Sequence, residues 1–134
     1  MMGLDMFLYG VEYHSEYDEE EDNDKSYYVI TEEIYWRKAN QIHKWFVENV
    51  QDGVDNCAMY YVSRSDLIEL KCICENVLEN TSLAPLYLPT QSGFFFGSTD
   101  YDSFYFSKLK YTVEKIDELL KNEDYDYYKY QSSW

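Results

Sequence analysis

A short segment in the first third of the chain gathers residue types that bind planar anionic molecules. On a helix, Trp36, Asn40 and His43 would share one strip of the surface. Arg37 and Lys44 would flank Asn40 on the neighbouring strip. An indole can stack on a base, cations can bind phosphate and an amide can contact a base edge. The pattern predicts a site for a small anionic ligand such as a nucleotide, although solvated cations and a histidine packed in the core would explain the same residues structurally.

A second candidate is an aromatic run of Phe94, Phe95 and Phe96, flanked by Gly93 and Gly97. Alternate side chains of a strand point to opposite faces, so the three rings cannot all enter one core. At least one ring therefore needs a second partner, either another helix or a ligand. The run lacks the lysine and the spacing of a phosphate-binding loop. We expect these rings to form one wall of the site predicted above, with a structural turn as the alternative.

Patterns for catalysis or metal binding are sparse. The side chains of Cys72 and Cys74 would point about 200° apart on a helix, and their spacing is too short for a common zinc pair. Cys57 and His43 could form a nucleophile and base, but such a pair occurs in most chains. The acidic segment from Glu16 to Asp24 has neither the glycine nor the spacing of a calcium-binding loop. The sequence therefore predicts no catalytic residue, no metal and no cofactor, and an enzyme is the least favoured class.

The formal net charge is −15, and seven acids fall between Glu16 and Asp24. Like charges at this density repel, which predicts a flexible, solvated loop at about residues 14–26. The chain lacks the clustered lysines and arginines that bind nucleic acid directly or attach to anionic membranes. An acidic protein can instead imitate nucleic acid on a basic enzyme.

Three stretches carry apolar residues at helical spacing, with Thr31 and Ser63 as candidate N-caps. The ends of the chain, at about residues 4–13 and 125–134, have the pattern of strands. We predict that residues 1–134 form a single α+β domain, in which three helices pack with a small antiparallel sheet formed by the terminal strands. The predicted helices cover about residues 32–50, 64–79 and 101–121. The predicted core comprises Ile42, Phe46, Leu67, Leu70, Cys74, Leu109, Val113 and Ile116.

The number of cysteines indicates the cellular compartment in which the protein is expected. Three cysteines and an N-terminal segment without the features of a signal peptide predict reduced thiols in a cytoplasm. No stretch approaches 18 consecutive apolar residues, so we expect no membrane span.

Five motifs together resemble a family of small proteins found in phages and prophages of Gram-positive bacteria. They are GLDM at 3–6, YWRKAN at 35–40, IHKWF at 42–46, LPTQSGFFFG at 88–97 and QSSW at 131–134. The resemblance spans nearly the whole chain and implies a phage accessory protein in the host cytosol, without naming an activity. Such proteins often disarm host defences. Two functions stay open: sequestration of a small anionic ligand such as a signal nucleotide, and inhibition of a host defence protein by an acidic mimic of nucleic acid.

Overall fold

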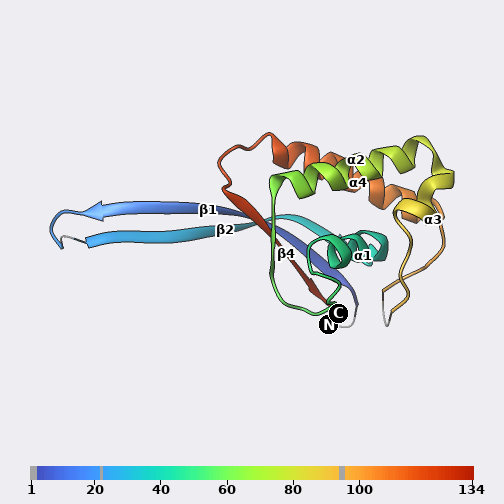
Figure 1. Cartoon of the computed structure of the whole chain (residues 1–134), viewed down its shortest axis with the longest axis horizontal. Helices are drawn as coiled ribbons and strands as arrows, with labels where there is room; N and C mark the ends of the chain where they lie inside the picture. Colours follow the sequence, from blue (N-terminus) through green and yellow to red (C-terminus); the bar gives the residue numbers. More distant parts are fainter. Residues whose placement is uncertain (1–2, 22, 94–95) are drawn as a thin grey trace.

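The computed structural model describes residues 3–21, 23–93 and 96–134. Four strands, β1 (Asp5–Asp18), β2 (Asn23–Arg37), β3 (Tyr60–Val62) and β4 (Tyr127–Ser133), form one antiparallel sheet in the order β2-β1-β4-β3. The helices are α1 (Asn40–Asn49), α2 (Arg64–Glu79), α3 (Ala84–Tyr87) and α4 (Ser103–Leu120), and a 3-10 turn covers Thr81–Leu83. The fold is α+β as predicted, but its sheet is larger than a pair of terminal strands and it has an additional short helix (Figure 1).

The prediction of a loop at residues 14–26 is wrong, because most of this segment belongs to the β1–β2 hairpin. The two strands pair in register up to the turn, with Tyr13 opposite Tyr28 and His14 opposite Tyr27. The rings of His14 and Tyr27 stack with centroids 5.1 Å apart, and such cross-strand aromatic pairs stabilise a hairpin. Exposed carboxylates repel one another only weakly in salt-containing water, so their repulsion does not prevent pairing.

The predicted helix at residues 32–50 is correct only in its second half. Strand β2 continues through Trp36, and α1 starts after Lys38, whose φ of 54° lies in the left-handed region. Ile34 and Trp36 alternate along β2 and are almost completely buried, which is the period of a strand. Pairing with β1 supplies the hydrogen bonds that a helix would otherwise have made within itself.

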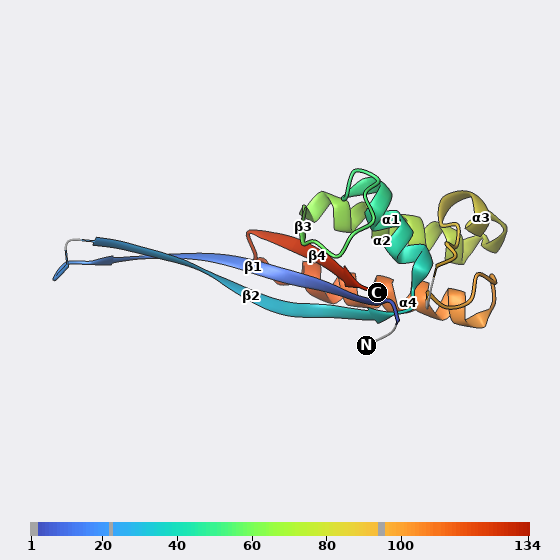
Figure 2. The ribbon, with the colours of Figure 1, turned by 90° about the horizontal axis from the view of Figure 1, so that it is seen from below.

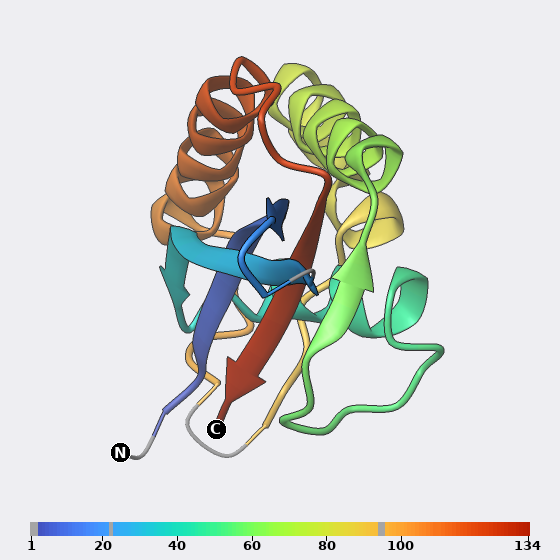
Figure 3. The same cartoon turned by 90° about the vertical axis from the view of Figure 1, so that its left-hand side faces the viewer.

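One face of the sheet carries the core. Met6 and Leu8 of β1 alternate with outward-facing residues, as do Tyr128 and Tyr130 of β4, and all four are buried. Helices α2 and α4 lie side by side over the sheet, as Figure 3 shows. Of the predicted core, only Val113 is half-buried, and the other seven residues are fully buried.

Local signals set the limits of the two long helices. Ser63 accepts a hydrogen bond from the Asp66 N–H, and the Asp66 carboxylate accepts one from the Ser63 N–H, which completes a capping box for α2. The Asp102 carboxylate accepts from the Tyr105 N–H and caps α4. In the described ranges, no helix combines the length and apolar character needed to cross a bilayer.

The outer part of the hairpin stands away from the body of the protein. Strand β4 pairs with β1 only from Asp5 to Val11, so the paired segments beyond Val11 form a two-stranded ribbon. Figures 1 and 2 show this ribbon extending past the helices. We call residues 12–29 the hairpin arm. A bond from the Tyr13 N–H to the Asp126 carboxylate at 2.6 Å holds its base to the body.

Candidate functional site

The predicted site residues do not form a single strip, because they lie on two different elements. Trp36 lies on β2, where its Nε1 donates to Thr112 of α4 at 2.9 Å inside the core. Arg37 is exposed at the end of the same strand. Lys44 is half-buried on α1 and pairs with Glu48 at 3.1 Å. The prediction that Trp36 and Arg37 line a cavity together with the α1 residues is therefore wrong, since a helical strip does not continue into a strand.

Asn40 joins α1 to the loop that carries the phenylalanine run. Its Nδ2 donates to the carbonyls of Phe96 and Ser98 at 3.1 and 2.9 Å, and its Oδ1 accepts from the Gln91 N–H at 3.0 Å. The side chain is 1% exposed. The side-chain amide of Asn40 therefore holds this loop in position through its hydrogen bonds.

His43 connects the core to the surface through two hydrogen bonds. Its Nε2 lies 2.9 Å from Asp55 Oδ1, and its Nδ1 lies 2.7 Å from the Tyr130 hydroxyl. A carboxylate can only accept, so Nε2 carries the proton and Nδ1 of the neutral ring accepts from Tyr130. Burial lowers the pKa of His43, and the neighbouring Asp55 carboxylate opposes this only in part. Burial also raises the pKa of Tyr130 well above its ordinary value.

The burial of His43 argues against acid–base chemistry at this residue. The imidazole is 0% exposed and its two nitrogens are both engaged, so a substrate cannot reach it. Its two hydrogen bonds link Tyr130 of β4 to Asp55. Among the described residues, no group of His, Cys, Asp and Glu side chains is arranged to hold a metal ion.

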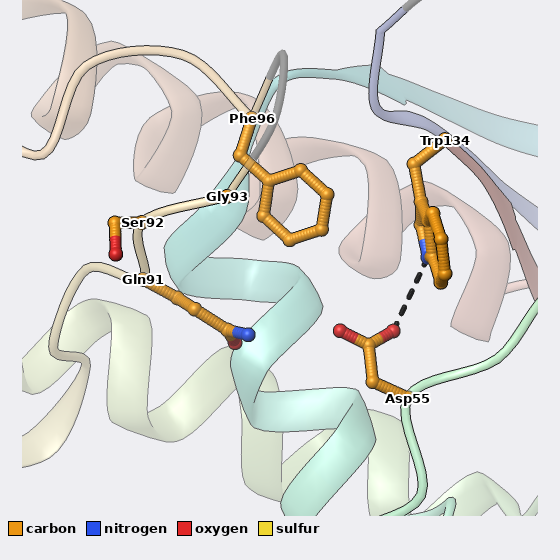
Figure 4. A pocket seen from close by; sticks show the side chains of 6 residues that line it. All are labelled: Asp55, Gln91, Ser92, Gly93, Phe96 and Trp134. Carbon is orange, nitrogen blue, oxygen red and sulfur yellow. Dashed lines mark hydrogen bonds between the residues drawn. The ribbon is translucent and has the colours of Figure 1, made fainter.

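An open pocket of about 240 Å³ lies next to this network (Figure 4). Asp55 comes from the loop after α1, and Trp134 follows β4, where its Nε1 donates to Asp55 Oδ1 at 3.2 Å. Phe96 forms another wall, and its ring meets the His43 ring edge-on at 5.6 Å. The residues that line the pocket are Asp55, Gln91, Ser92, Gly93, Phe96 and Trp134.

The structure thus brings together only part of the predicted site. Asn40, His43 and Phe96 are neighbours, but only Phe96 lines the pocket. The predictions for Phe94 and Phe95 fall outside the described residues. Sequence reasoning did not assign Asp55 and Trp134 to the site, although Trp134 ends the QSSW motif. Asp55 lies in the loop before β3 and Trp134 follows β4, and these two strands pair in the sheet.

The hairpin arm offers a second candidate surface. Tyr13, Tyr17 and Tyr28 lie on one face of it, because Tyr13 and Tyr28 are a directly opposed pair and Tyr17 follows at an even spacing. We call these three residues the tyrosine face. Each of them is about half exposed or more, and Tyr17 reaches 62%. Glu19, Glu20 and Glu21 form an exposed turn at the tip.

Comparison of the chain with models of known protein families, with curated proteins and with solved structures found no match.

Proposed function

We propose that this protein is a phage-type accessory protein that binds and inhibits a basic host defence protein through its hairpin arm. The observation that carries the proposal is the placement of the acids on a regular, projecting hairpin. Residues 12–29 contain eight acids and one lysine, a net charge of −7 out of −15 for the whole chain. Concentrated carboxylates on a projecting element attract a basic surface and accelerate the encounter with it.

The tyrosine face supplies the contact area that charge alone does not. Tyrosine is enriched in protein interfaces, where it buries a large ring with little loss of side-chain entropy. A two-stranded ribbon has no further layer to cover its aromatic side chains, and an isolated hairpin is only marginally stable in water. Docking on a partner would cover Tyr13, Tyr17 and Tyr28 and would stabilise the arm.

The pocket gives less support to the other function, sequestration of a small anionic ligand. Among the described residues, its lining contains a carboxylate, Asp55, and neither lysine nor arginine. Its volume of about 240 Å³ is below the roughly 300–1,000 Å³ typical of ligand sites. Charge and size therefore favour the inhibitor function.

The resemblance to phage and prophage proteins suggests that the partner is a nucleic-acid-binding defence enzyme in the host cytosol. The three cysteines are all unpaired, in keeping with that compartment. The net charge of −15 disfavours direct binding of the protein to nucleic acid, so competition must take place on the partner's basic surface.

The test is displacement of labelled DNA from a panel of purified nucleic-acid-cleaving defence enzymes of Gram-positive bacteria, followed by fluorescence anisotropy. We expect the wild-type chain to displace DNA from at least one enzyme. The tip variant, with Glu19, Glu20 and Glu21 changed to lysine, should compete at least about tenfold less well. Failure of the wild type to displace DNA from every enzyme in the panel would contradict the proposal.

A control variant separates the arm from total charge. Changing Glu75, Glu79 and Glu114 to lysine alters three exposed sites on α2 and α4. Because each change adds two charges, this variant and the tip variant both have a net charge of −9. We expect the control to compete almost as well as the wild type. Equal losses in the two variants would show that the arm has no special role.

A further inference from the structure

The described residues that line the pocket include one carboxylate, of Asp55, and the rings of Phe96 and Trp134. The ring centroids of Phe96 and Trp134 lie 6.4 Å apart, with their planes at 60°. The Asp55 side chain is 26% exposed, so solvent reaches its carboxylate. In the view of Figure 4 this carboxylate lies below and between the Phe96 and Trp134 side chains. Ring faces and a carboxylate both attract cations.

The two oxygens of Asp55 are used unequally. Oδ1 accepts from His43 Nε2 at 2.9 Å and from Trp134 Nε1 at 3.2 Å, which occupies both of its lone pairs. No hydrogen bond joins Oδ2 to another described residue. In Figure 4 the oxygen without a dashed line faces the space below the Phe96 ring. One acceptor oxygen is thus available to a ligand.

In the described part of the chain, the carboxylate of Asp55 pairs with His43 and with no lysine or arginine. Burial lowers the pKa of His43, which keeps the ring neutral at neutral pH. Among the described residues, neither lysine nor arginine forms an ion pair with Asp55. A cation entering the pocket would therefore meet a partly desolvated carboxylate that no described lysine or arginine neutralises.

We propose that this pocket binds a small organic ammonium group, with one N–H donated to Asp55 Oδ2 and the alkyl part against Phe96 and Trp134. An ammonium is a compact charge that needs only one oxygen. A guanidinium binds best through two parallel bonds to both oxygens of a carboxylate, and Oδ1 is already occupied. A volume of about 240 Å³ suits an amine of a few carbons. This inference is independent of the hairpin arm and would stand if the inhibitor function failed.

The binding experiment can use the indole of Trp134 as its reporter. Trp134 is 48% exposed, whereas Trp36 and Trp45 are almost fully buried. The full chain, labelled with ¹⁵N, is titrated with butylammonium at constant ionic strength, and the shift of the Trp134 indole N–H is recorded. Methylguanidinium and adenosine monophosphate serve as comparison ligands. We expect saturable binding of butylammonium, at least about fivefold weaker binding of methylguanidinium and no binding of the nucleotide.

Two isosteric substitutions provide the decisive comparison. Asp55→Asn keeps an Oδ1 that can accept from His43 and Trp134, but replaces Oδ2 by a donor and removes the charge. Asp52→Asn makes the same charge change in an exposed turn with a φ of 57°, which asparagine tolerates. We expect Asp55→Asn to weaken butylammonium binding at least about tenfold and Asp52→Asn to leave it unchanged.

Three outcomes would overturn the inference: equal losses in the two variants, tighter binding of the nucleotide than of the amine, or a wild-type chain that does not bind butylammonium. If Asp55→Asn failed to fold, as judged by its melting temperature, Trp134→Leu would replace it. That variant removes a ring from the pocket wall, and butylammonium binding is then followed by calorimetry. Unchanged affinity in Trp134→Leu would also refute the site.

Discussion

The indole Nε1 of Trp36 donates to the Oγ1 of Thr112 at 2.9 Å, and this bond ties strand β2 to helix α4 inside the core. Thr112 in turn donates to the Lys108 carbonyl at 2.7 Å, so its hydroxyl serves as acceptor and donor at once. Trp36 is 2% exposed and Thr112 is fully buried. Water therefore cannot replace either partner without opening the core.

Replacing Thr112 by valine should lower the free energy of unfolding by about 1–3 kcal/mol, because the shape is kept and the buried indole N–H loses its acceptor. Urea denaturation measures the change. In a Trp36→Phe background that N–H is absent, so the same substitution should cost less. Identical losses in the two backgrounds would mean that the bond contributes nothing.

Asn40 allows a sharper test of the loop that carries Phe96. In Asn40→Asp, a carboxylate oxygen would replace the amide nitrogen that now lies about 3 Å from two carbonyl oxygens. We expect destabilisation on the order of 3–5 kcal/mol at neutral pH, since the charge is buried without a partner. The control is Asn49→Asp on the same helix, where an exposed side chain donates only to the Trp45 carbonyl. A similar loss in both variants would contradict the proposed loop-positioning role.

The lowered pKa of His43 makes a prediction about pH and stability. The unfolded chain, with an ordinary pKa near 6.5, takes up a proton that the folded chain binds only at lower pH. Stability is therefore full above about pH 6.5 and falls as the pH drops through the lowered pKa of the folded state. We expect the free energy of unfolding to decrease as the pH is lowered from about 6.5 to about 5.5.

Histidine variants separate this effect from the carboxylates, which titrate at lower pH. His43→Gln should show a smaller decrease than the wild type over the same interval. His14→Gln is measured in parallel, because His14 forms a separate pair with Glu12 on the hairpin arm, 3.0 Å apart. The prediction is wrong if the slope of stability against pH survives in His43→Gln.

Thiol reactivity tests the burial of the helix α2 stripe. Burial raises the pKa of Cys74 to about 12, whereas Cys57 and Cys72 are exposed. A thiol-specific reagent at neutral pH should label two thiols of the native chain rapidly and the third only after denaturation. Cys74→Ala should keep both rapid reactions. Fast labelling of Cys74 in a folded double variant without Cys57 and Cys72 would place its side chain at the surface.

Elements defined by local signals were predictable from the sequence. Helix α2 has the predicted bounds, because Ser63 and Asp66 mark its start and apolar residues follow at helical spacing. Strand β2 was not predictable in this way. Ile34 fits the apolar stripe of a helix as well as the alternation of a strand, and the choice depends on pairing with Leu8, distant in the sequence.

The residues of the candidate site also divide into those that the sequence could indicate and those that it could not. Asn40, His43 and Phe96 stood out by residue type, and they do lie together. Asp55 and Trp134 could not be chosen from the sequence, because one lies in an irregular loop and the other after the last strand. The loop with Asp55 leads into β3, which pairs with β4, and the folded chain places the two side chains within hydrogen-bonding distance.

The length of the hairpin arm also sets how far its tip lies from the body of the protein. Seven residues of β1, from Glu12 to Asp18, continue past the last pair with β4. At about 3.4 Å per residue they carry the tip roughly 24 Å from the edge of the body. Any basic surface that meets the tip can therefore lie well away from the pocket.

The length of the arm can be changed without moving Tyr17 to the other face only if an even number of residue pairs is added or removed. Removing Ser15 and its opposite residue Ser26 would shorten the arm by about 3.4 Å and turn Tyr17 to the other face. Removing His14 and Tyr27 as well would shorten it by about 6.8 Å in total and return Tyr17 to its original face. Such an arm can change its length, in evolution or by design, by two opposed residue pairs at a time and keep the same residues on each face. Adding or removing a single pair would exchange the residues on the two faces.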